Sequence, residues 1–309
     1  MSTNIRIGMI GLDTSHVIAF ANLLHAPQNK YCVAGGKVVV AYPGGSHDME
    51  MSYTRVEKFT QELKENYGVE MVNSISEVAE KCDAVLLESV DGRVHLEQFK
   101  EIVAYGKPVF IDKPFTTTSV DANEMIRLAK QHQTPIMSSS SLRYSEGLAN
   151  ALGNTEEGNI IGMDCYGPLA MEKTHGWFWY GVHTAEMLYR AFGTGCEEVK
   201  VTKNKDHDVL VAVWKNGNIA TIRGNRKGNS KFGALIHRET GTQFVDVYAD
   251  DKPYYASLLE EIITFFKTGK SPISMEETLE ITKFLEAANE SRKTGNTVKV
   301  TETTIKERI

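Results

Sequence analysis

Short apolar runs alternate with amphipathic stretches along roughly the first 140 residues. Apolar runs bounded by turn residues are typical of buried strands, and the stretches between them have the period of helices. This alternation predicts a doubly wound, Rossmann-like parallel sheet. The predicted strands are Ile5–Ile10, Lys37–Tyr42, Ala84–Leu87, Pro108–Ile111 and Ile136–Ser138, and the predicted helices are about Ser15–Leu24, Thr54–Tyr67, a short one after Ser74, Val94–Tyr105 and Val120–Gln131.

Beyond about residue 145 the pattern changes to strand-length segments that follow one another directly. Asn216-Gly217 and Thr240-Gly241 supply tight turns between them. We predict an α+β domain with a mostly antiparallel open sheet and helices on one face. The domain boundary is expected near residue 140, which gives domains 1–140 and 141–309. The predicted strands are Val199–Thr202, Val209–Trp214, Ile219–Arg223, Ala234–Arg238, Gln243–Tyr248 and Thr297–Val300, and the helices are about Trp179–Ala191, Tyr254–Lys267 and Met275–Arg292.

Composition narrows the class of protein. The 309 residues include 40 acidic residues and 34 Lys and Arg, a formal charge of -6 that argues against a nucleic-acid partner. No stretch approaches the roughly 20 apolar residues that span a bilayer, so we expect no membrane partner. The N-terminal segment lacks the pattern of a signal peptide. The four cysteines form no C-x-x-C pair, and we expect a cytoplasmic protein with reduced thiols.

Several motifs occur in a characteristic order. Ile111-Asp112-Lys113-Pro114 follows a late strand of the first sheet, Arg143-Tyr144 follows the sixth strand, and Gly181-Val182-His183 opens a later helix. Together with the closing stretch Ala287–Val300, this order resembles the Gfo/Idh/MocA family, whose members are mostly NAD(P)-dependent dehydrogenases of sugars and polyols. The resemblance implies a dinucleotide-binding first domain, a second domain for substrate binding and oligomerisation, a small-molecule substrate, and a homodimer or homotetramer formed through the open sheet face.

The turn after the first strand departs from the family's dinucleotide motif. That motif, G-x-G-x-x-G, lets the backbone approach a pyrophosphate at a helix N-terminus. The window here is Gly11-Leu12-Asp13-Thr14-Ser15-His16, so only the first glycine is present. Asp13 is placed to cap the helix by accepting hydrogen bonds from the amides of Ser15 or His16, which a pyrophosphate would use. A role of Asp13 in ligand binding is the alternative.

The end of the second strand also departs from the motif. NAD enzymes carry an acidic residue there that binds the ribose hydroxyls. Tyr42 occupies this position with no adjacent arginine of the NADP type, and Ser46 or His47 could substitute for the acid. The resemblance still assigns NAD or NADP to this edge. Its expected contacts are Gly11, Asp13, Thr14, Ser15, His16, Tyr42 and Lys113.

Two residues are candidates for the chemistry. Lys113, in the position of the family's Glu-Lys-Pro lysine, would polarise a substrate oxygen; a surface lysine before a proline is the alternative. His183 would act as acid and base, with Tyr180 or Glu186 orienting it, because Trp179 replaces the family's aspartate. A core histidine bonded to backbone is the alternative.

Aromatic and cationic residues nearby are candidates for substrate binding. Trp177 and Trp179 belong to an aromatic run just after His175, and such faces stack on sugar rings. A hydrophobic plug between domains is an equal alternative. Arg143 and Tyr144 could bind a substrate carboxylate or hydroxyl, or Arg143 could form a salt bridge at the domain boundary.

The sequence thus predicts an NAD(P)-dependent oxidoreductase that transfers hydride to or from a sugar, polyol or related metabolite. One alternative is a sugar-binding or regulatory protein that has lost the dinucleotide. Another is a metal-assisted lyase, isomerase or hydrolase, with ligands drawn from His175, His183, Glu186, Glu172 and Asp164. Their spacing matches no metal signature, so no metal ligand is assigned.

Overall fold

The computed structural model describes residues 4–171 and 175–300. Contacts between residues divide the chain into two compact units. The first unit contains the residues up to Thr116, then Asp121–Ser139 and Lys252–Met275. The second contains Thr117–Val120, Ser140–Asp251 and the residues from Glu276 onward. The assignment of functions to domains 1–140 and 141–309 stays a prediction.

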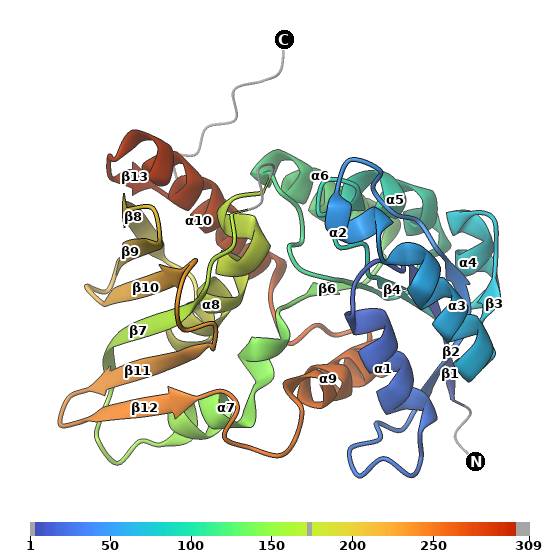
Figure 1. Cartoon of the computed structure of the whole chain (residues 1–309), viewed down its shortest axis with the longest axis horizontal. Coiled ribbons are helices and arrows are strands. Elements are labelled where there is room, and N and C mark those ends of the chain that lie inside the picture. The colour runs from blue at the N-terminus through green and yellow to red at the C-terminus, as the bar shows by residue number, and fades with distance from the viewer. Residues whose placement is uncertain (1–3, 172–174, 301–309) are drawn as a thin grey trace. The chain divides into compact units, whose positions relative to one another are not determined.

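The first unit contains a six-stranded parallel sheet in the order β3-β2-β1-β4-β5-β6 (Figure 1). This is the strand order of a doubly wound dinucleotide-binding fold, so the predicted fold class is confirmed. The chain reverses its winding between β1 and β4, where open sheets bind ligands outside the carboxyl ends of the strands. The strands are β1 (Ile5–Ile10), β2 (Gly36–Tyr42), β3 (Glu70–Met71), β4 (Ala84–Leu87), β5 (Val109–Ile111) and β6 (Ile136–Ser138).

Helices pack on this sheet, and local signals set their ends. Ser74 caps one helix, because its Oγ accepts a hydrogen bond from Glu77 N at 3.3 Å and donates to Glu77 Oε1 at 3.0 Å. Gly68 ends another in the left-handed conformation, with φ of 65°. The helices are α1 (His16–His25), α2 (Glu50–Tyr53), α3 (Val56–Tyr67), α4 (Ile75–Lys81), α5 (His95–Ile102) with the 3-10 turn η1 (Val103–Tyr105), α6 (Ser119–His132) and α9 (Tyr254–Thr268).

The second unit contains a seven-stranded sheet in the order β12-β11-β7-β10-β9-β8-β13 (Figure 1). Only β7 and β10 run parallel; the other neighbours are antiparallel, as predicted. The helix α8 packs on β7 and β10. The elements are η2 (Ser141–Tyr144), α7 (Glu146–Gly153), β7 (Ile160–Pro168), α8 (Trp177–Phe192), β8 (Cys196–Lys203), β9 (His207–Trp214), β10 (Ile219–Asn225), β11 (Gly233–Arg238), β12 (Thr242–Asp246), α10 (Met275–Thr294) and β13 (Val298–Lys299).

The central strand β7 was not predicted. Its sequence carries two glycines and ends in proline, a composition typical of turns. Packing explains one of these glycines, because a Cβ on Gly167 would lie 2.3 Å from the ring of Phe232. None of the helices in the described part of the chain combines the length and apolar character needed to cross a membrane.

One fully buried carboxylate joins three elements of the second unit. Asp208, on β9, accepts hydrogen bonds from Arg226 at 2.8 Å and from Nε of Arg292, on α10, at 2.6 Å. Removing one partner from a buried ion-pair network leaves the opposite charges uncompensated. This network therefore holds the closing helix to the sheet.

Replacing Asp208 by alanine is expected to lower the free energy of unfolding by about 3 kcal/mol. All three tryptophans lie in the second unit, so tryptophan fluorescence during urea denaturation measures this loss. The control is Glu198→Ala, which removes an exposed pair with Lys299 in the same unit and is expected to change stability little. Equal losses in the two variants would show that the Asp208 network does not stabilise the unit.

Candidate functional site

The turn after β1 is held between the ends of β2 and β4. Gly11 N donates to Tyr42 O at 3.0 Å, and Leu12 N donates to Pro43 O at 2.7 Å. Gly11 has a φ of +83°, and a Cβ there would lie 2.5 Å from Ser89 N. Glycine is therefore required at this position, as in a dinucleotide-binding turn.

Asp13 does not cap α1, so that prediction is wrong. Its fully buried carboxylate accepts hydrogen bonds from Ser52 Oγ at 2.6 Å and from Val90 N at 2.9 Å. Ser15 stands at the N-cap, exposed and without a side-chain capping bond. The carboxylate therefore points into the protein, where it links α2 to the loop after β4. It accepts from none of the first amides of α1, where His16 N instead makes a long hydrogen bond of 3.4 Å to Thr14 Oγ1.

Ionisable side chains gather at the carboxyl ends of β4 and β5. His16 Nδ1 lies 2.9 Å from Asp112 Oδ2 and 3.9 Å from Glu88 Oε2, and Lys113 Nζ lies 3.8 Å from Asp112 Oδ2. Burial, and then the charge of Asp112, raise the pKa of Glu88 well above its usual range. Burial opposes ionisation of Asp112 too, but the charges of His16 and Lys113 lower the pKa of Asp112.

Sequence reasoning assigned Lys113 and His16 to this edge but did not single out Glu88. A usable signal was present, because Glu88 directly follows a buried strand just as Asp112 does. The ring of His16 also lies 5.0 Å from that of Tyr255, on α9, between centroids. No local pattern in the sequence connects residues so far apart.

In the second unit, His183 lies inside α8, which begins at Trp177, rather than at its start. Its Nδ1 lies 2.7 Å from Ser140 Oγ. Glu186 accepts hydrogen bonds from Ser140 N at 3.3 Å and from Arg143 Nη1 at 3.1 Å. Ser140 thus links Glu186 to His183, and sequence reasoning did not single it out.

Arg143 forms ion pairs within the second unit. It lies between Glu186 and Glu277, on α10, and all three side chains are largely buried. Burial raises the pKa of Glu186 although the Arg143 charge lowers it. The ring of Tyr144 lies 5.3 Å from the guanidinium carbon of Arg190. These contacts favour the ion-pair interpretation of Arg143 over binding of a substrate anion.

The aromatic run is mostly buried. Trp177 is fully buried, and its backbone N donates to Asn289 Oδ1 at 2.9 Å. His175 is buried, and its ring lies 5.6 Å from that of Trp179 between centroids. Tyr180 is half-buried beside His183. Core packing therefore accounts for Trp177, Trp179 and His175, and within the run Tyr180 is the residue left partly accessible for stacking on substrate.

The comparisons with known proteins agree with this geometry. The Gfo/Idh/MocA family model, described as an oxidoreductase family with an NAD-binding Rossmann fold, matches residues 5–140. Residues 5–140, less than half of the chain, are therefore similar to the first domain of this family. This match confirms the predicted resemblance for the part of the chain that contains the whole first sheet. No curated protein sequence matches the chain.

Solved structures extend the likeness in fold to nearly the whole chain. Myo-inositol 2-dehydrogenase from Lactobacillus plantarum has 17% identity and a TM-score of 0.80, covering 96% of this chain and 99% of that one. Scyllo-inositol dehydrogenase from Lactobacillus casei, solved with bound NAD(H) and scyllo-inositol, has 15% identity and a TM-score of 0.80, covering 97% and 100%. At these identities the likeness shows the fold.

The first sheet fits the family's NAD on two observations besides Gly11. The amides at the start of α1 are not capped by Asp13, as a pyrophosphate requires. A cavity of about 540 Å³ lies beside Gly44, at the end of β2, and against α3. Glu57 lines this cavity and offers a carboxylate for the ribose hydroxyls, although it lies on a helix and not at the end of β2, where the motif has its acidic residue.

The metal site considered at His175, His183 and Glu186 is not supported. Within residues 4–171 and 175–300, the one group of three histidine, cysteine or acidic side chains close enough to share an ion is His16, Glu88 and Asp112. Asp164 lies on the open sheet face, where it bonds to Thr221 and His237. Glu172 lies outside the described residues.

Asp13→Asn is expected to stabilise the protein at neutral pH. Burial raises the pKa of Asp13, so the ionised form is penalised in the folded state. That penalty is absent below the unfolded pKa and complete above the folded pKa. Asparagine keeps an oxygen for Val90 N and an amide for Ser52 Oγ. The variant should exceed the wild type in unfolding free energy at pH 7.5, by a margin that shrinks toward pH 4, as measured by chemical denaturation followed by circular dichroism.

Asp83→Asn provides a control of opposite sign. The side-chain hydrogen bond from Arg6 lowers the pKa of Asp83, so its contribution to stability is present above the unfolded pKa and lost as pH falls. This variant should be less stable than the wild type at pH 7.5. If Asp13→Asn behaved in the same way, the inward-facing charge would be stabilising and our account of Asp13 would be wrong.

Proposed function

We propose that the protein is an NAD-dependent dehydrogenase that oxidises a CH–OH group of a polyol or sugar-like metabolite. The observation that carries this proposal is the family match over the whole first sheet, together with the Gly11 turn and the α1 N-terminus left uncapped by Asp13. The names of the structural neighbours, inositol dehydrogenases, support a polyol as substrate. The four free cysteines support a reducing, cytoplasmic environment.

The cofactor contacts follow from the edge of the first sheet. The amides of Ser15 and His16 would hold the pyrophosphate, and Glu57 would accept hydrogen bonds from ribose hydroxyls beside Tyr42. Because a carboxylate repels a 2′-phosphate, Glu57 favours NAD over NADP. NAD, when bound, supplies the hydride acceptor.

The proton chemistry falls to Lys113 and His183. Lys113 would stabilise negative charge on the reacting oxygen, and Asp112 holds its ammonium group at 3.8 Å. His183 would take the hydroxyl proton, with Ser140 fixing its ring through Nδ1. The backbone N of Ser140 donates a hydrogen bond to the Glu186 carboxylate, which holds Ser140 in place. The ring of Tyr180 lies beside that of His183.

Calorimetric titration with NAD⁺, NADH, NADP⁺ and NADPH tests the cofactor assignment. We expect NAD⁺ or NADH to bind in about the micromolar range, and NADP(H) to bind at least tenfold more weakly. Protein that is folded and free of retained nucleotide, yet binds none of the four, would overturn the proposal in favour of a binding or regulatory protein.

Variants separate the proposed roles. Glu57→Gln should weaken NAD⁺ binding about threefold to tenfold through loss of a charged hydrogen bond, while Glu62→Gln on the same helix should not. With inositols and sugars as substrates, Lys113→Met and His183→Phe should each lower kcat by about 100-fold or more. If both variants bind NAD⁺ as tightly as the wild type, the loss of kcat reflects the chemical step and not cofactor binding.

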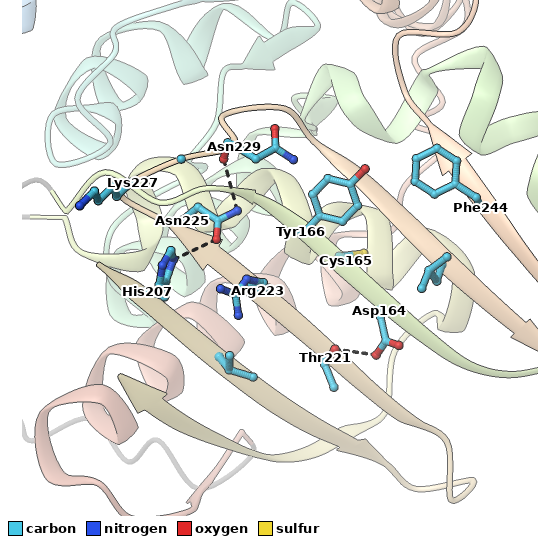
Figure 2. A pocket seen from close by; sticks show the side chains of 13 residues that line it. Asp164, Cys165, Tyr166, His207, Thr221, Arg223, Asn225, Lys227, Asn229 and Phe244 are labelled. Carbon is cyan, nitrogen blue, oxygen red and sulfur yellow. Dashed lines mark hydrogen bonds between the residues drawn. The ribbon is translucent and has the colours of Figure 1, made fainter. Parts of the chain in front are cut away.

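We also propose that the open face of the second sheet forms a homodimer or homotetramer contact. Large apolar side chains lie exposed there, including Ile219, Leu235 and Phe244. Leu235 and Phe244 line a cavity of about 850 Å³ together with Arg223 and Asp164 (Figure 2). Exposed apolar patches of this kind mark association surfaces.

Phe244→Glu is expected to convert the oligomer to monomer, since it places a charge at the most exposed of these apolar side chains, at 59%. Size-exclusion chromatography with light scattering gives the mass directly. Tyr53→Glu, at a 50% exposed position of the first unit, is the control and should leave the mass unchanged. A wild-type protein that is monomeric at high concentration would contradict the proposal.

A further inference from the structure

Glu88 carries a buried carboxylate with no hydrogen-bond partner. Its side chain is fully buried, and neither Oε1 nor Oε2 accepts a hydrogen bond. The neighbouring Asp112 carboxylate is also fully buried, and its nearest side-chain partner is His16, whose Nδ1 lies 2.9 Å from Oδ2. Buried polar atoms are nearly always satisfied in folded proteins, so the two unsatisfied oxygens of Glu88, next to a second buried carboxylate, call for a ligand.

The neighbouring imidazole completes a metal-ligand set. One ligand atom from each of His16, Glu88 and Asp112 lies within 4.8 Å of the other two. Ligands on a common ion at about 2.1 Å lie roughly 3 to 4.2 Å apart. The separations of His16 Nδ1 from Asp112, 2.9 Å, and from Glu88, 3.9 Å, therefore need only small side-chain shifts.

We propose that His16, Glu88 and Asp112 form a binding site for one divalent transition-metal ion, of the Mn²⁺ or Zn²⁺ class. One imidazole and two carboxylates are donors that such ions accept, and the set leaves positions for water. The charge also fits. Lys113 supplies a single positive charge near Asp112, whereas an ion would compensate both carboxylates at once.

The position of the site follows from the topology of the first unit. His16 begins α1, and the two carboxylates directly follow the neighbouring strands β4 and β5. Three segments that the chain contributes separately thus converge at the carboxyl edge of one sheet. The site goes beyond the proposed dehydrogenase activity and does not depend on it, because the ion can be measured without dinucleotide.

Titration of chelator-treated protein with MnCl₂ and with ZnCl₂ alone, by calorimetry, tests the site. One equivalent of at least one ion should bind per chain and remain after dialysis, as measured by elemental analysis, and should raise the melting temperature. Glu88→Gln and Asp112→Asn should each weaken binding at least tenfold, because each removes a charged ligand of nearly unchanged shape.

Asp91→Asn is the matched control. Asp91 is a fully buried carboxylate of the same loop, but Arg93 binds both of its oxygens. Its metal affinity should equal that of the wild type. Folded wild-type protein that binds neither ion would overturn the proposal, and so would a Glu88→Gln variant, folded by circular dichroism, that binds as tightly as the wild type. Neither result bears on NAD binding.

Discussion

The carboxylate of Asp13 organises the edge of the first sheet. It stands in the turn after β1, and it binds α2 through Ser52 and the loop after β4 through Val90. Three segments far apart in the sequence are thereby fixed around one fully buried group. Because this carboxylate bonds to α2 and to the loop after β4, the turn places no acidic cap on the first amides of α1, although two of the motif's three glycines are absent.

The buried carboxylates described above have close hydrogen-bonding or oppositely charged partners, except for Glu88. In the second unit Arg143 lies between two glutamates, and Asp208 lies between two arginines. Each of these buried charges is paired with charges of opposite sign, and the ion pairs hold neighbouring segments together. At the edge of the first sheet Glu88 has no such partner, and its pKa is raised. An unpaired buried carboxyl group is costly, so a fold retains one where it serves binding or chemistry.

Local patterns predicted most of the fold. Alternating apolar runs gave five of the six strands of the first sheet, while β3, with only two residues, carries no pattern. The strand β7 was missed because a tertiary contact with Phe232 demands a glycine that locally indicates a turn. The motifs around Lys113 and His183 make both residues candidates for catalysis. The role of Asp13 was misjudged, because capping is a local rule and its true partners lie 39 and 77 residues away.

The first unit is not one continuous piece of chain. Residues 252–275 belong to it although they follow the body of the second unit in the sequence. They include α9, which packs on α1 and brings Tyr255 against His16 and Phe20. On the ribosome, where synthesis runs from the N-terminus, the sheet can form early, but the face that carries α1 stays uncovered until α9 emerges. No single cut in the chain separates the two units, so completion of the dinucleotide fold is tied to synthesis of nearly the whole protein.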